Sequence, residues 1–113
     1  MNRTVRLELP NAAARSPVAG QVVLALAIAC GAGPVAGERL RRSVQAAAAA
    51  APGSLAINAV AERGSLDLTF SADPDEGWAD RATQLLAQHG AVRTEDGVEL
   101  RVERTSLFRV ADV

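Results

Sequence analysis

The longest stretch without a charged residue, Ser16 to Gly37, constrains the fold of this chain more than any other feature. Its densely apolar part, 22–30, is shorter than the roughly 20 residues that a membrane-spanning helix needs. Ser16 followed by Pro17 predicts a helix N-cap with proline in the first turn, and the GAGP motif after Ala29 predicts the helix end. Because this helix is apolar nearly all round, we expect a sheet, a second helix or a partner chain to cover most of it.

Charge and cysteine content exclude several classes of protein. Twelve basic and thirteen acidic residues give a net charge of -1, which provides no electrostatic footprint for nucleic acid or an anionic membrane. The single cysteine, Cys30, cannot form an internal disulfide, and its apolar surroundings predict a small buried residue. The N-terminal sequence MNRTVRLELP lacks the apolar segment of a secretory signal. We therefore expect a cytoplasmic protein without a nucleic-acid or membrane partner.

Alternation of apolar and polar residues predicts the strands. Residues 3–9 alternate Val and Leu with Thr, Arg and Glu, and Pro10 ends the run. Residues 55–61 and 66–70 predict an antiparallel hairpin with its turn at 63–64. A second hairpin is expected over 91–104, around a turn rich in acidic residues and glycine.

Two more helices follow from proline, glycine and apolar spacing. One is expected from Pro34 to just before Pro52, with its core face formed by Leu40, Val44, Ala47, Ala48 and Ala51. Its six consecutive alanines favour a helix without tertiary help. The third is expected to start at Asp73–Glu76, to place Trp78, Ala82, Leu85, Leu86 and His89 at helical spacing, and to end at Gly90.

The order βααββαββ predicts an α+β fold: a two-layer sandwich with a mixed, mostly antiparallel sheet of about five strands and three helices on one face. A chain of 113 residues fits one domain. We place that domain at 1–104. The remaining C-terminal tail, 105–113, has no clear period and is expected to dock on the domain, bind a partner or fray.

A resemblance to a known family rests on three segments of the sequence. They are VRLELP, GERLRRSVQ and SLAINAVAERGSLDLTFSADPDEG. Together with the order of the elements, they resemble the histidine-kinase-like ATPase domain, and within it the bacterial anti-sigma regulatory factors of the serine kinase type. The resemblance covers residues 3–104. It implies the fold of that family, here shortened.

The resemblance also implies where catalytic residues should lie. The family needs a glutamate and, four residues later, an asparagine that holds Mg²⁺ on the second helix. In the most natural register these positions fall on Ala46 and Ala50, which can neither accept a proton nor bind a metal. A shift of one residue either way does not help, because 45–51 contains no acid and no asparagine.

The family's adenine-binding turn has only a remnant in this chain. An Asp-x-Gly-x-Gly motif is expected there, whereas Asp73 and Gly77 are separated by Pro74, Asp75 and Glu76. Asp73 could still meet an adenine, but it is better interpreted as a helix cap. The glycine-rich lid that covers the phosphates in the family is missing, because Trp78 to His89 is expected to be helical throughout.

The remaining candidates favour structural roles. We expect no serine or cysteine near His89 for it to activate, and one histidine alone cannot form a metal site. Trp78 is interpreted as a core or edge aromatic. Arg39, Arg41 and Arg42 are typical of a solvated helix face, but with Arg15 they are also candidates for binding an acidic protein partner. We expect neither a metal nor a cofactor.

The residues and the resemblance together lead to one functional hypothesis with two alternatives. The first is a non-catalytic, anti-sigma-factor-like regulator that has lost its nucleotide site and binds a sigma factor, an antagonist or a catalytic paralogue. A homodimer formed through the first strand and first helix fits it. The alternatives are an active ATP-dependent serine kinase anti-sigma factor, and a small structural or oligomer-forming protein unrelated to sigma regulation.

Overall fold

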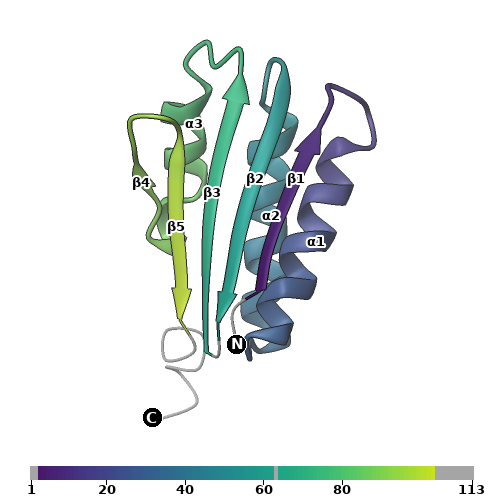
Figure 1. Cartoon of the computed structure of the whole chain (residues 1–113), viewed down its shortest axis with the longest axis vertical. Coiled ribbons are helices and arrows are strands. Elements are labelled where there is room, and N and C mark those ends of the chain that lie inside the picture. Colours follow the sequence, from purple (N-terminus) through teal and green to yellow (C-terminus); the bar gives the residue numbers. More distant parts are fainter. Residues whose placement is uncertain (1–2, 63, 104–113) are drawn as a thin grey trace.

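A computed structural model describes residues 3–62 and 64–103 of the chain, in two layers (Figure 1). One layer is a five-stranded sheet, and three α-helices form the other, so the predicted α+β class is confirmed. In chain order the elements are β1 (Arg3–Leu9), α1 (Arg15–Ala29), α2 (Pro34–Ala49), β2 (Ser54–Glu62), β3 (Ser65–Asp73), α3 (Trp78–Leu85), the short 3-10 helix η1 (Ala87–His89), β4 (Val92–Arg93) and β5 (Val98–Glu103). The predicted tail, 105–113, lies outside the described residues.

The strands are ordered β1-β2-β3-β5-β4 across the sheet, and every neighbouring pair in the described sheet is antiparallel. The register places Ile57 opposite Phe70 and Phe70 opposite Val98. These three side chains are at most 1% exposed. Because side chains alternate along a strand, the same register directs the polar residues of each strand to the open face of the sheet.

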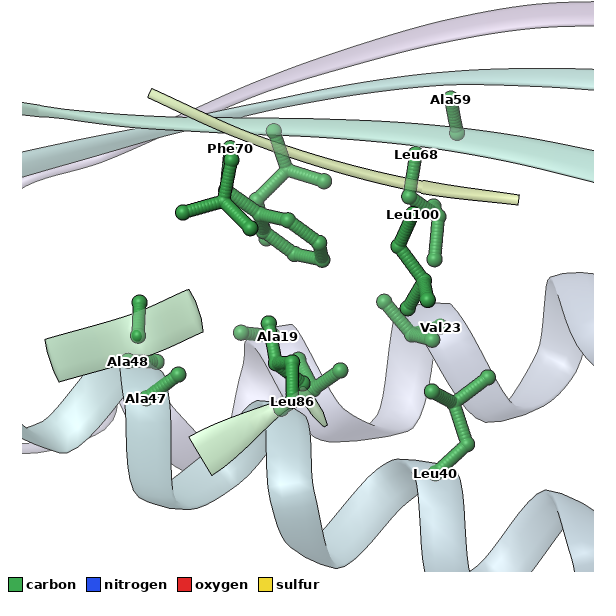
Figure 2. Close-up of a cluster of buried hydrophobic side chains, with 14 of the residues drawn as sticks. Ala19, Val23, Leu40, Ala47, Ala48, Ala59, Leu68, Phe70, Leu86 and Leu100 are labelled. Atoms are coloured by element: carbon green, nitrogen blue, oxygen red, sulfur yellow. The ribbon is translucent and has the colours of Figure 1, made fainter. Parts of the chain in front are cut away.

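The core lies between the sheet and the helices. In Figure 2, Leu68, Phe70 and Leu100 of the sheet project toward the helices, which contribute Ala19, Val23, Leu40, Ala47, Ala48 and Leu86. The five residues predicted for the core face of α2 are at most 5% exposed, although Ala51 lies just beyond the helix, which ends at Ala49. Alanine at these positions lets the helix lie close to the sheet.

Small residues also bring α1 and α2 together. A Cβ atom added at Gly37 would lie 3.0 Å from Leu24, and one added at Gly20 would lie 3.1 Å from the Arg41 side chain. Cys30, at the end of α1, is 7% exposed as predicted. Its thiol donates a hydrogen bond to the Ser65 carbonyl at 3.2 Å, and burial raises its pKa.

One expectation for α1 was wrong. The helix begins at Arg15, its N-cap is Ala14, and Ser16 lies inside the first turn without a capping hydrogen bond. Within the described chain Val18 and Ile28 of α1 remain 42% and 52% exposed, so any further cover of the helix would have to come from a partner chain. Within the described ranges, no helix combines the length and the apolar character needed to cross a membrane.

The start and length of α3 also differ from expectation. Asp73 is the last residue of β3, paired with Ser54, so it cannot cap the helix. The N-cap residue is Gly77, and the Oδ1 of Asp75, two residues earlier, accepts hydrogen bonds from the backbone N–H groups of Gly77 and Ala79 at 3.0 and 3.3 Å. The helix ends at Leu85 rather than continuing to His89, and Gly90 terminates η1 with a φ of 83°.

Candidate functional site

Ala46 and Ala50, where the resemblance implies an acid and a metal ligand, lie at the end of α2. Ala46 is exposed in the last turn, and Ala50 is the half-buried C-cap residue. Both side chains are methyl groups, which offer no proton acceptor and no metal ligand. The C-terminal part of α2 therefore supplies only backbone groups to any chemistry at this place.

Trp78 closes the space between α2 and α3. Its side chain is buried, and the indole Nε1–H donates a hydrogen bond to the Ala47 carbonyl at 2.7 Å. The hollow that remains beside Ala50 has a volume of about 130 Å³ and is also lined by Pro52, Glu76, Gly77, Trp78 and Arg81. Small-molecule pockets usually have volumes of roughly 300–1,000 Å³. The hollow is thus too small to enclose a nucleotide.

Asp73 and Gly77, which were expected to be what is left of an adenine-binding turn, line different hollows in the structure. Gly77 lines the hollow beside Ala50, in a left-handed conformation with a φ of 84°. Asp73 instead lines a shallow hollow of about 480 Å³ that also includes Arg6, Glu8 and Ser54. The backbone carbonyl of Asp73 accepts a hydrogen bond from the Ser54 hydroxyl at 3.2 Å. Asp73 and Gly77 therefore do not form one binding turn.

Arg15 does not belong with the surface arginines. It is 6% exposed, and its guanidinium donates hydrogen bonds to the carbonyls of Ala51, at 2.8 Å, and Gly53. It therefore anchors the start of α1 to the loop between α2 and β2. A guanidinium occupied in this way is not available to an acidic partner, so its assignment to the partner-binding set was wrong.

The three arginines of α2 also differ from one another. Arg41 lies over Gly20 of α1, and its guanidinium donates to Glu38 and, at 2.6 Å, to Gln45. Arg39 is exposed, and the side chain of Arg42 is 75% exposed, 3.6 Å from Glu38. Only Arg39 and Arg42 therefore present their charge outward.

A serine lies next to the only histidine of the chain, contrary to expectation. The Ser43 Oγ lies 3.0 Å from the His89 Nε2 and accepts a hydrogen bond from the Gln88 Nε2 at 3.0 Å. Burial lowers the pKa of His89, so the imidazole is neutral near pH 7. The sequence did contain a sign of this contact. Ser43 lies three residues after Leu40, on a helix face that is otherwise apolar.

Another hollow, here called the Arg39 pocket, adjoins this histidine. It has a volume of about 350 Å³ and lies where α2, η1 and β5 meet. It is lined by Arg39 and Leu40 of α2, Gln88 and His89 of η1, and Arg101 and Val102 of β5. The sequence did not predict that these residues form one site, because they come from three separate elements.

No protein-family model and no curated protein matches this chain. The candidate sites therefore rest on the residues and geometry given above. Among residues 3–62 and 64–103, no three His, Cys, Asp or Glu side chains gather closely enough to hold a metal ion.

Proposed function

We propose that this chain is a non-catalytic, anti-sigma-factor-like regulatory protein that acts by binding another protein in a bacterial partner-switching pathway in the cytoplasm. One observation supports the proposal: beside Ala50, where the resemblance implies a nucleotide site, the described structure holds only a small hollow. Its volume is about 130 Å³, and the Trp78 indole bonded to Ala47 forms part of its lining. Binding, rather than phosphoryl transfer, is the activity that such a domain retains.

The exposed face of α2 is the surface we assign to the protein partner. Arg39 and Arg42 project from it beside Val35, which is 67% exposed, and the three line a hollow of about 370 Å³ with Pro34 and Glu38. Arginine next to an exposed apolar side chain is typical of protein interfaces. The two guanidiniums favour an acidic partner surface, for which a sigma factor, an antagonist or a catalytic paralogue are the candidates from the resemblance.

A second copy of the chain is proposed to bind at the edge of the sheet formed by β1. β1 is an edge strand of the sheet, and its inward side chains Val5 and Leu7 are only partly buried. If two β1 strands pair antiparallel about Leu7, Arg6 lies opposite Glu8 of the second copy. The same register places Val5 opposite Leu9 on the helix side and brings the exposed face of α1 toward its counterpart.

Calorimetric titration with Mg-ATP tests the loss of nucleotide binding. We expect no saturable heat for the full chain. Micromolar binding of Mg-ATP would overturn the proposal and favour the alternative of an active serine kinase, which transfer of radiolabelled phosphate to a co-purified partner would then establish.

Affinity capture from the native host, followed by mass spectrometry, tests the binding function. We expect a regulator of transcription to be captured by the wild-type chain and lost with Arg42→Glu, while Arg81→Glu, an exposed arginine on α3, retains it. If sedimentation shows self-association and capture yields no other protein, the alternative of a small oligomer-forming protein replaces the proposal.

A further inference from the structure

The Arg39 pocket has the size of a site for a small ligand. Its volume of about 350 Å³ falls within the roughly 300–1,000 Å³ of small-molecule pockets. It lies near the N-terminal half of α2, away from the hollow beside Ala50 at the other end of that helix. It is therefore independent of the site where nucleotide binding is proposed to be lost.

The charge of the pocket lining is positive. Arg39 and Arg101 both line the pocket, and none of its described lining residues is acidic. Across the described chain, Arg39 forms no ion pair. Arg101 pairs with Glu103 at 2.9 Å and with Asp67 at 3.5 Å, but its side chain is 56% exposed and such pairs contribute little. An incoming anion can therefore compete for both guanidiniums.

The polar groups behind the arginines are held in position. The Ser43 hydroxyl, on a residue 8% exposed, lies 3.0 Å from both the His89 Nε2 and the Gln88 Nε2. Because both η1 side chains share this one buried contact, their positions at the pocket are fixed before a ligand binds. Leu40 and Val102, which are 1% and 7% exposed, contribute an apolar part of the lining.

The geometry points to a binding site for a small organic anion in the Arg39 pocket, with its carboxylate or phosphate group at Arg39 and Arg101 and its apolar skeleton against Leu40 and Val102. Guanidiniums match the planar or tetrahedral oxygen arrangement of these groups with paired N–H donors. The apolar lining favours a compound with carbon atoms over a bare inorganic ion. The site does not require the proposed regulatory function, but Arg39 also belongs to the surface assigned to the protein partner. Arg39→Gln therefore tests both proposals, whereas benzoate binding to the wild-type chain tests the anion site alone.

The test is an NMR titration of the full chain, ¹⁵N-labelled, with sodium benzoate at constant ionic strength. We expect saturable shifts of the backbone amides of Gln88, His89, Arg101 and Val102. Benzamide, which has the same shape without the charge, is expected to produce none. Arg39→Gln should weaken benzoate binding about tenfold, the loss expected for one charge-assisted hydrogen bond.

Two further measurements make the result decisive. Arg81→Gln, which removes an exposed arginine outside the pocket, should leave benzoate affinity unchanged; an equal loss in this variant would mean diffuse attraction and overturn the site. Inorganic phosphate should bind more weakly than benzoate, and equal or tighter binding would overturn the assigned role of Leu40 and Val102. Benzoate shifts that do not saturate, or that benzamide reproduces, would also refute the proposal.

Discussion

The indole nitrogen of Trp78 donates a hydrogen bond to the backbone carbonyl of Ala47, 2.7 Å away, and this contact joins α3 to α2. Replacing Trp78 by Phe keeps most of the ring volume and removes the donor, so we expect a loss of about 1 kcal/mol in the free energy of unfolding. Trp78→Ala also opens a cavity and should cost about 3–5 kcal/mol. Urea denaturation measures the loss in unfolding free energy for both variants. Leu85→Ala, at a partly exposed position of α3, is the control for an apolar truncation in the same helix.

Removal of the guanidinium of Arg15 should destabilise the fold although the side chain is charged. Arg15→Met keeps the apolar stem but leaves the carbonyls of Ala51 and Gly53 without this donor. We expect the free energy of unfolding to fall by about 2–3 kcal/mol. The exposed substitution Arg81→Met should change it by less than about 0.5 kcal/mol. Equal effects in the two variants would mean that Arg15 does not anchor α1.

The only histidine makes stability depend on pH in a predictable direction. Burial lowers the pKa of His89 in the folded protein, whereas the unfolded chain keeps a value of about 6.5. The unfolded state therefore binds the proton more readily, and the free energy of unfolding should be fully maintained above about pH 6.5 and decrease as the pH falls below it. His89→Gln should remove this slope between about pH 7 and 5.5.

NMR titration of the same imidazole provides an independent check. Since no other histidine is present, its C–H signals are unambiguous. A folded-state pKa at or above about 6.5 would contradict the predicted direction.

Gly97 and Gly90 are expected to be glycine for different reasons. Gly97 has no space for a Cβ atom, whereas Gly90 has a positive φ. A Cβ atom at Gly97 would lie 2.0 Å from the Phe70 carbonyl oxygen, so Gly97→Ala requires β3 or β5 to move. At Gly90, with a φ of 83°, an added Cβ meets nothing within 4 Å, and Gly90→Ala should cost only the backbone strain of about 1–2 kcal/mol. Thermal unfolding should therefore show a larger loss for Gly97→Ala. The opposite ranking would mean that the β3–β5 pairing tolerates the extra atom.

Adding the two side chains implied by the resemblance should not confer nucleotide binding. The double variant Ala46→Glu, Ala50→Asn supplies an acid and an amide at these positions, but the hollow beside Ala50 has a volume of only about 130 Å³ before any atom is added. Calorimetry with Mg-ATP is expected to show no saturable heat in this variant, as in the wild type. Saturable binding would mean that the two side chains alone were limiting.

Most of the fold was predictable because it depends on local patterns. The alternation in β1 and the spacing of Leu40, Val44 and Ala47 in α2 were sufficient to identify these elements and their buried faces. The Asp73 error arose because pairing with Ser54 extends β3 through a residue that otherwise has a strong capping preference. A sequence pattern reports propensity, and here a tertiary contact determined the boundary.

Contacts between distant segments were less predictable. Ser43 and His89 are 46 positions apart, so their contact depends on how η1 packs on α2. Arg15 has the local sequence context of a surface residue, and only the fold of the loop before β2 places two carbonyls around it. The Arg39 pocket likewise depends on three elements that meet only in the folded chain.

The position of β1 at the edge of the sheet has a consequence for biosynthesis. Its neighbour in the described sheet is β2, and the register joins Arg3 with Ala61 and Leu9 with Leu55. Of the described strands β1 is synthesised first, but it has no hydrogen-bonding partner until both helices and the start of β2 have emerged. Throughout that interval the nascent chain exposes an amphipathic strand with two open edges, which is the period when a chaperone would be most useful.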